Sequence, residues 1–115
     1  MTEAREHPPL TPLSMHILLA LAEQDLHGYA LMQEIRQQSG GAVSPGTGSL
    51  YAAVQRLVDD ELISVVPADE PSGRRGSTYR LTRTGRGAAG AEAKRLQEVL
   101  DLASERKIVA GPEGA

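Results

Sequence analysis

The chain has no cysteine, no tryptophan and no phenylalanine, and only three tyrosines among its 115 residues. The absence of cysteine excludes disulfides, thiolate metal sites and cysteine nucleophiles. The shortage of aromatic residues means that a core must be built from Leu, Ile, Val, Met and Ala. Runs of about 18 apolar residues and the apolar core of a signal peptide are also missing, so we expect a cytoplasmic protein of one domain.

Catalytic and metal-binding patterns have little support. His7, His16 and His27 are scattered and form no i, i+4 pair of ligands. The acidic cluster Asp59–Glu61 occupies consecutive positions, which diverge by about 100° on a helix and cannot converge on one substrate. The segment Gly46–Ser49 lacks the preceding strand and following lysine of a phosphate-binding loop. We therefore predict no enzyme, no metal site and no cofactor.

Positive charge is concentrated in one segment although the formal net charge is −3. Residues 73–87 contain no acid and five arginines: Arg74, Arg75, Arg80, Arg83 and Arg86. Binding to nucleic-acid phosphates requires only one basic face, so the local cluster outweighs the net charge.

The central segment, residues 44–63, has the pattern of an amphipathic helix. Ser44 is a suitable N-cap and Pro45 suits the first helical position. Leu50, Val54, Leu57 and Val58 recur at helical spacing and predict the buried face. The opposite face is small and polar at its N-terminal half, whereas the acids lie at the C-terminal end. This distribution is typical of a helix that enters a DNA groove with its N-terminus first, although an ordinary solvated helix face explains it equally well.

The remaining segments predict a winged helix-turn-helix, mainly α with a small β-hairpin. Thr11 and Pro12 begin a helix extending to about Gln24, and a second helix runs from about residue 29 to 39. Strands near residues 63–66 and 79–82 flank a loop that carries Arg74 and Arg75, which predicts a two-stranded wing after the three-helix bundle. We expect a winged-helix domain over residues 11–82, with disordered ends at residues 1–10 and 110–115.

Residues 83–109 are predicted to form one long C-terminal helix, capped by Thr82 and weakened by glycines in its first turns. A lone helix must bury its apolar stripe, and the same helix of a second copy is the economical partner. The expected dimerisation residues are Ala89, Ala93, Leu96, Val99, Leu100 and Ala103.

Three motifs together resemble the PadR-like transcriptional regulators: HGYAL at 27–31, SPGTGSLYAAVQRLVDDELI at 44–63 and SGRRGSTYRLTRTGR at 72–86. The resemblance covers residues 13–102 and implies a dimeric winged helix, usually a repressor, often with a small-molecule effector. Gly48-Ser49 is inserted relative to the family's GTLY motif, and Glu61 replaces its usual glycine. The absence of tryptophan argues against the stacking of planar drugs seen in some short members.

The candidate DNA-binding residues are Ser44, Thr47, Ser49, Tyr51, Gln55, Arg56, Arg74 and Arg75. The resemblance implies that the Tyr51 hydroxyl contacts a phosphate; the alternative is a tyrosine at the edge of the core. Thr47 and Ser49 either contact DNA or only cap the helix, and Arg56 either reads bases with Gln55 or pairs with an acid of its own helix. Arg74 and Arg75 are expected to hold DNA backbone, whereas Tyr29 and Tyr79 are expected to be structural.

These observations predict a homodimeric DNA-binding transcriptional regulator, most simply a repressor of a pseudo-palindromic operator. Its third helix would read the major groove. The alternative is a winged-helix module that binds proteins and not DNA, as the negative net charge and the altered GTLY motif suggest.

Overall fold

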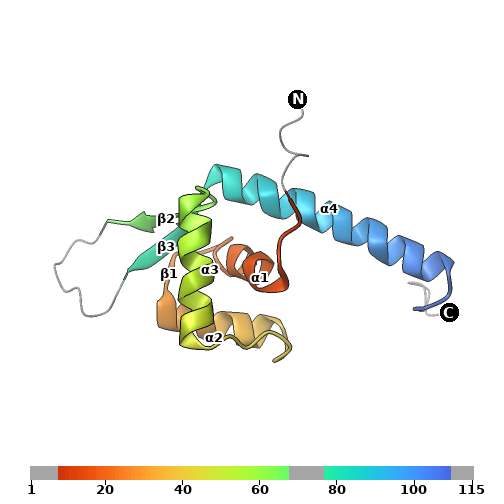
Figure 1. Ribbon diagram of the computed structural model, residues 1–115, viewed down its shortest axis with the longest axis horizontal. Helices are drawn as coiled ribbons and strands as arrows, with labels where there is room; N and C mark the ends of the chain where they lie inside the picture. The colour runs from red at the N-terminus through yellow and green to blue at the C-terminus, as the bar shows by residue number, and fades with distance from the viewer. Residues whose placement is uncertain (1–7, 68–76, 110–115) are drawn as a thin grey trace.

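The computed structural model describes residues 8–67 and 77–109. The element order is α1 (Pro12–Ala20), β1 (Leu26–His27), α2 (Gly28–Gln38), α3 (Thr47–Asp59), β2 (Ile63–Val66), β3 (Thr78–Leu81) and α4 (Arg83–Glu105). Helices α1, α2 and α3 form a head with the small sheet on one side, and α4 projects far beyond the head on the other (Figure 1). The mainly helical winged-helix fold with a long C-terminal helix is therefore confirmed.

The core of the head is aliphatic, as the composition requires. Its largest fully buried side chains come from the three helices of the head and from β2: Ile17, Leu18, Leu31, Ile35, Leu50 and Ile63. The predicted inward stripe of α3 is buried at Leu50, Val54 and Leu57 and partly buried at Val58. Burial of these aliphatic side chains is the main term that stabilises the head.

Helix α1 begins where the sequence predicted and ends earlier. The Thr11 hydroxyl accepts a hydrogen bond from the Ser14 amide at 3.0 Å, which is the expected N-cap. The helix stops at Ala20 and not near Gln24, because the chain turns there into β1. This two-residue strand pairs with β3, and sequence analysis missed it.

The start of α3 differs from the prediction. Gly46 is the N-cap, so the helix begins at Thr47 and neither Ser44 nor Pro45 belongs to it. The Ser44 hydroxyl instead accepts a hydrogen bond from Arg36 Nε at 3.2 Å. The side chain expected to cap α3 is thus engaged by the end of α2, and Pro45 holds Ser44 out of helical geometry.

The end of α3 is a Schellman motif built without glycine. The Leu62 amide donates to the Leu57 carbonyl and the Glu61 amide donates to the Val58 carbonyl, each at 2.9 Å. Glu61 adopts a left-handed conformation, with φ of 64°. The turn that normally uses glycine is therefore made by a glutamate at some cost in backbone energy.

The sheet has three antiparallel strands in the order β1-β3-β2. Tyr79, at the centre of β3, is paired with Leu26 on one side and Val65 on the other. Tyr79 is buried, which confirms its predicted structural role and raises the pKa of its phenol. The wing tip with Arg74 and Arg75 lies outside the described residues.

Helix α4 is fastened to the head at its first turns. Thr82 caps it by accepting from the Gly85 amide at 2.9 Å, as predicted. Gly85 was expected to weaken these turns, but it is a packing residue: a Cβ at this position would overlap the Leu62 carbonyl. A Cβ at Gly87 or Gly90 would meet open space. The helix ends at Glu105, a few residues before the predicted Val109.

Candidate nucleic-acid interface

One face of α3 is exposed and carries most of the predicted site. Thr47, Ser49, Gln55 and Arg56 lie on it together with the small residues Gly48 and Ala52. In Figure 1 this helix crosses the front of the head, with the sheet at one side. Nothing in the described part of the chain covers this face, which leaves room for a large ligand.

The N-terminal turn of α3 is open to an external acceptor. No side chain caps it, and no acidic residue lies in its first turn. Leu50 is the first residue whose amide reaches back into the helix, where it donates to the Gly46 carbonyl at 3.0 Å. The amides of Thr47, Gly48 and Ser49 have no acceptor among the described residues, and they lie at the positive end of the helix dipole. Such a turn favours an anionic group.

Tyr51 lies at the edge between this face and the core. Its side chain is 42% exposed, and its phenol lies against Gly28, the first residue of α2. The side chain thus packs on α2 while part of its surface remains in solvent, so the structure accommodates both alternatives raised by the sequence.

Gln55 and Arg56 are placed differently along the face. The Gln55 amide donates to the Asp59 carboxylate at 3.0 Å, so this acid is engaged by Gln55. No salt bridge joins Arg56 to Asp59 or Asp60 within the described ranges, which contradicts the intrahelical pairing considered for it. Arg56 borders a groove of about 360 Å³ between the end of α3 and residues 8–11. It therefore lies away from the open N-terminal turn.

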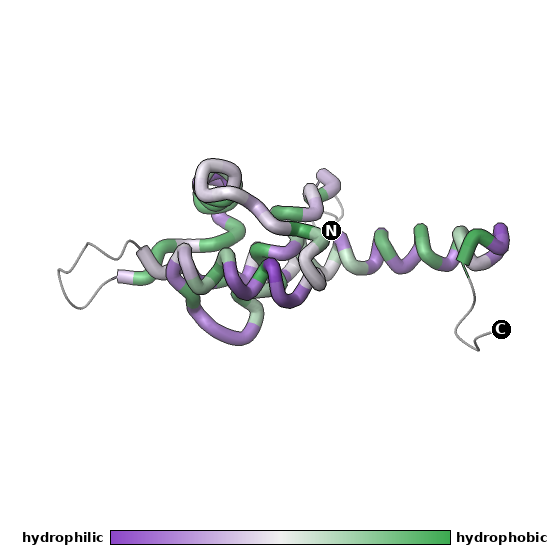
Figure 2. Tube along the Cα trace, turned by 90° about the horizontal axis from the view of Figure 1, so that it is seen from below, coloured by the Kyte–Doolittle hydropathy of each residue, from purple (hydrophilic) through white to green (hydrophobic). Residues whose placement is uncertain are grey.

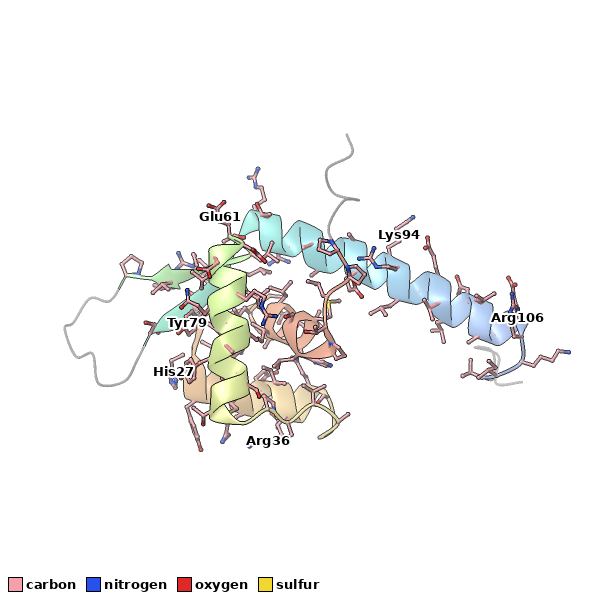
Figure 3. All side chains as sticks on the ribbon, viewed as in Figure 1. His27, Arg36, Glu61, Tyr79, Lys94 and Arg106 are labelled. Carbon is pink, nitrogen blue, oxygen red and sulfur yellow. The ribbon has the colours of Figure 1, made fainter. Side chains whose placement is uncertain are left out.

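Helix α2 supplies exposed side chains that sequence analysis did not select. Tyr29 was expected to pack between helices, but it is 65% exposed and its hydroxyl accepts from Gln33 Nε2 at 2.9 Å. His27 caps α2 through Nδ1, which accepts from the Ala30 amide at 3.5 Å, and it projects beside the sheet (Figure 3). The HGY motif was the sequence signal that could have indicated this exposure. A tyrosine in the first turn of a helix, directly after the N-cap, points into solvent as readily as into the core.

Two arginines of the basic segment are used by the fold. Arg80 forms a bidentate pair with Asp25, with its closest contact at 2.9 Å. Arg86 donates to the Ala22 carbonyl at 2.8 Å. Both therefore hold the loop after α1 against the sheet and α4. The hydrogen bonds that Arg80 donates to the Asp25 carboxylate also raise the pKa of Arg80, so this side chain stays fully charged.

The apolar stripe of α4 is largely uncovered. Leu96, Val99, Leu100 and Leu102 are all exposed, with Val99 at 59%. Apolar positions recur along the projecting part of the helix in Figure 2, between hydrophilic ones. Ala89 instead packs against the core of the head, Ala93 is exposed and Ala103 is partly buried. The exposed apolar face therefore begins at Ala93, one turn beyond the predicted Ala89, and includes Leu102.

The described residues contain no group of three His, Asp or Glu side chains arranged to hold a metal ion. No helix in residues 8–67 or 77–109 is both long and apolar enough to cross a membrane.

Comparison with known proteins identifies the fold's relatives. Residues 17–91, more than half of the chain, match the model of the transcriptional regulator PadR-like family. The chain belongs to the PadR-like family. A transcriptional regulator from Clostridium thermocellum has a TM-score of 0.70 at 22% identity, over 81% of this chain and 87% of that one.

Two further relatives differ in length from this PadR-like chain. The Bacillus subtilis PadR structure, solved in complex with operator DNA, has a TM-score of 0.62 at 22% identity, over 72% of this chain and 46% of that one. At these identities both structures show the shared fold alone. An uncharacterised 37.1 kDa protein in transposon Tn4556 of Streptomyces fradiae is 42% identical over 72 residues, which are 63% of this chain and 19% of that protein. The chain thus spans about a fifth of the length of this curated relative.

Proposed function

We propose that this PadR-like protein is a homodimeric, sequence-specific DNA-binding repressor. The observation that carries the proposal is the exposed face of α3, whose N-terminal amides have no acceptor within residues 8–67 and 77–109 and whose acids lie at the far end. The first turn would hold a phosphate while Ser49, Thr47 and Gln55 face the groove. The family of regulators, with one relative solved on its operator, supports this use of the fold.

The second part of the proposal assigns the two ends of the molecule. Residues 11–82 would bind DNA and residues 83–109 would join two copies, with contacts centred on Leu96, Val99 and Leu100. A projecting helix with an uncovered apolar face is poorly suited to remain alone in water. The two heads would then present their α3 helices to half-sites about one helical turn apart on a pseudo-palindrome.

The wing completes the proposed interface. Arg74 and Arg75 are flanked by glycines in the sequence and would hold the DNA backbone beside each half-site. Because Arg80 and Arg86 are engaged within the fold, we assign that contact to Arg74 and Arg75. Release by a small-molecule effector that alters the dimer is the proposed mode of regulation, and the cytoplasm is the proposed compartment.

Binding to DNA upstream of the protein's own gene, measured across a salt series, tests the proposal. Affinity should fall steeply as salt rises, and Arg74→Ala/Arg75→Ala should weaken binding and flatten the salt dependence by about two counter-ions per head. Arg106→Ala, which removes a charge near the end of α4, is the control. An absence of binding to this fragment and to random duplex at low salt would favour the alternative, a module that binds proteins.

The dimer is tested separately by light scattering during size-exclusion chromatography. Leu100→Glu should give a monomer, because it places a charge in the centre of the proposed contact. Glu98→Lys, which lies on the opposite side of α4 and is exposed, should leave the dimer intact. If Leu100→Glu and the unmodified protein have the same mass in solution, α4 does not join the two copies.

A further inference from the structure

Glu92 of α4 is a buried carboxylate far from the proposed DNA-binding face. It is only 5% exposed. Its Oε1 accepts hydrogen bonds from the Leu10 amide at 3.1 Å and from Arg95 Nη2 and Nε at 2.8 and 3.3 Å. Burying a carboxylate is costly, so these bonds are needed to keep it there. Oε1 therefore joins α4 to a backbone amide 82 positions earlier in the chain.

The position of the Leu10 amide affects the start of α1 and the packing of the core. Leu10 directly precedes Thr11, the N-cap of α1, and its side chain packs against the core. Helix α1 in turn packs against α2 and α3 and also contacts α4 itself. A bond that fixes Leu10 to α4 therefore fixes the start of α1, and through it the head, to the projecting helix. Figure 1 shows the segment before α1 passing alongside α4.

Glu92 is the last buried residue of α4 and forms the outer of two hydrogen-bonded attachments to the head. The first comprises the Thr82 cap, the close packing of Gly85 on Leu62 and the Arg86 bond to Ala22. Between the two lie Gly87 and Gly90, which weaken the helix locally and have open space beside them. Ala88 and Ala89 pack on the core between these glycines, and α1 also contacts α4, but none of the described residues beyond Glu92 is buried. Loss of the Glu92 bonds would therefore free the outer end of the attached segment and let α4 tilt at Gly90, whereas the two attachments together fix its direction.

The direction of α4 controls the separation of the two α3 helices in the proposed dimer. Val99 lies nine residues beyond Gly90, or about 14 Å at the rise of an α-helix. A tilt of roughly 8° at the glycines would therefore move the dimer contact by about 2 Å relative to its own head. Both heads would shift at once, and each α3 would lose its register on the DNA.

We propose that Glu92 is a positioning residue that locks α4 to the head and thereby sets the half-site spacing that the dimer recognises. This inference rests on the proposed function for its DNA readout, but the lock itself is independent of DNA. Two variants distinguish the hydrogen bond of Glu92 from the space that its side chain fills. Glu92→Leu keeps the volume and removes the acceptor, whereas Glu92→Gln keeps an acceptor oxygen for the Leu10 amide. Glu105→Leu, an exposed position on the same helix, is the matched control.

The first test measures the lock without DNA. The natural chain has no cysteine, so Ala52→Cys on α3 and Glu98→Cys on α4 can be spin-labelled selectively. Labelled protein diluted with unlabelled protein gives the α3-to-α4 distance by double electron–electron resonance in a monomer or a dimer. We expect a narrow distribution in the parent and in Glu105→Leu, a broad one in Glu92→Leu, and an intermediate or narrow one in Glu92→Gln. The Leu10 amide should exchange with solvent on the order of tenfold faster in Glu92→Leu.

The second test measures spacing on DNA, with two half-sites separated by a series of inserted or deleted base pairs. The parent should prefer one spacing sharply, and Glu92→Leu should bind several spacings with similar affinity while still binding a single half-site as the parent does. A mere loss of stability would weaken all duplexes equally and would appear in a thermal melt. An unchanged distance distribution in Glu92→Leu would overturn the inference, whereas a parent that binds no DNA would overturn only the proposed function.

Discussion

The phenol of Tyr51 lies directly against Gly28, so that the first residue of α2 has no room for a Cβ. This contact joins the helix proposed to enter DNA to the helix that precedes it. The obstacle to a larger residue is a side chain and not backbone, so the strain of a substitution is carried by Tyr51 itself.

A double-mutant cycle should therefore show strong coupling between these two positions. Gly28→Ala should cost about 1–2 kcal/mol of stability while Tyr51 is present. In a Tyr51→Ala background the same change should be neutral or stabilising, because alanine is the better helix former. Urea denaturation of the four proteins gives the coupling free energy. Additivity to within about 0.5 kcal/mol would mean that the two residues do not meet in solution.

Gly85 and Gly90 should respond to alanine with opposite signs. A methyl group at Gly85 meets the Leu62 carbonyl, which is backbone and cannot rotate away, so Gly85→Ala should lower stability by about 2 kcal/mol or more. Gly90 faces open space within the same helix, and Gly90→Ala should raise stability by about 0.5–1 kcal/mol. Thermal and urea melts of the pair provide the comparison, and a gain in both would show that α4 does not pack on Leu62.

Ser49→Glu should strengthen the fold and weaken DNA binding. Ser49 is in the first turn of α3, where an acid interacts favourably with the helix dipole and should add about 0.3–1 kcal/mol of stability. The same carboxylate would repel a phosphate at that turn, and operator affinity should fall about tenfold or more. Thr84→Glu adds an equal charge to the first turn of α4 and should stabilise without affecting affinity. Equal loss of affinity in both variants would point to net charge and not to the α3 turn.

Glu61→Gly should stabilise the protein. The residue has φ of 64°, a conformation that costs an L-residue about 1–2 kcal/mol and costs glycine almost nothing. We expect a gain of about 1 kcal/mol in the free energy of unfolding. Asp60→Gly is the control, since Asp60 has φ of −87° and its replacement should destabilise. A loss in both variants would show that the α3 turn differs in solution.

The stability of the protein should depend on the charge of Glu92. Hydrogen bonds from Arg95 lower the pKa of Glu92 below its ordinary value of 4.5, burial opposes this, and the Leu10 amide adds to the lowering. A depressed pKa in the folded state contributes stability that is present above the unfolded value and lost as pH falls through the folded value. The stability advantage of the parent over Glu92→Gln should therefore be constant near neutral pH and shrink below about pH 4.5, as urea melts across pH would measure.

Much of the fold was predictable because local signals agreed with it. Thr11-Pro12 and Thr82 mark the starts of α1 and α4 with caps that the structure contains. The stripe of α3 is buried as its spacing indicates. Ser44 is a position where the local signals gave the wrong helix start. Ser44 followed by Pro45 satisfies the rules for an N-cap, but the Ser44 hydroxyl accepts a hydrogen bond from Arg36, eight residues earlier. No local rule contains that tertiary contact.

The candidate site was predictable in outline and not in its supporting contacts. Exposure of Thr47, Ser49 and Gln55 followed from periodicity. The strand at Leu26–His27 is too short to carry an alternating pattern, and the exposure of Tyr29 depends on how α2 sits against α3. From the sequence alone, Glu92 is predicted to be an exposed charge on the polar face of a helix, because the amide that it binds lies 82 residues away in the chain.

The short strand β1 connects the base of the wing to helix α2. His27 pairs with Thr78 in the sheet while its imidazole caps α2, so the base of the wing and the start of that helix share a single residue. A displacement of the wing would therefore move the start of α2, and the contact between Gly28 and Tyr51 would pass this movement to α3. The wing is therefore mechanically coupled to α3 through β1 and α2. We expect a contact of the wing with flanking DNA and the tilt of α3 to change together.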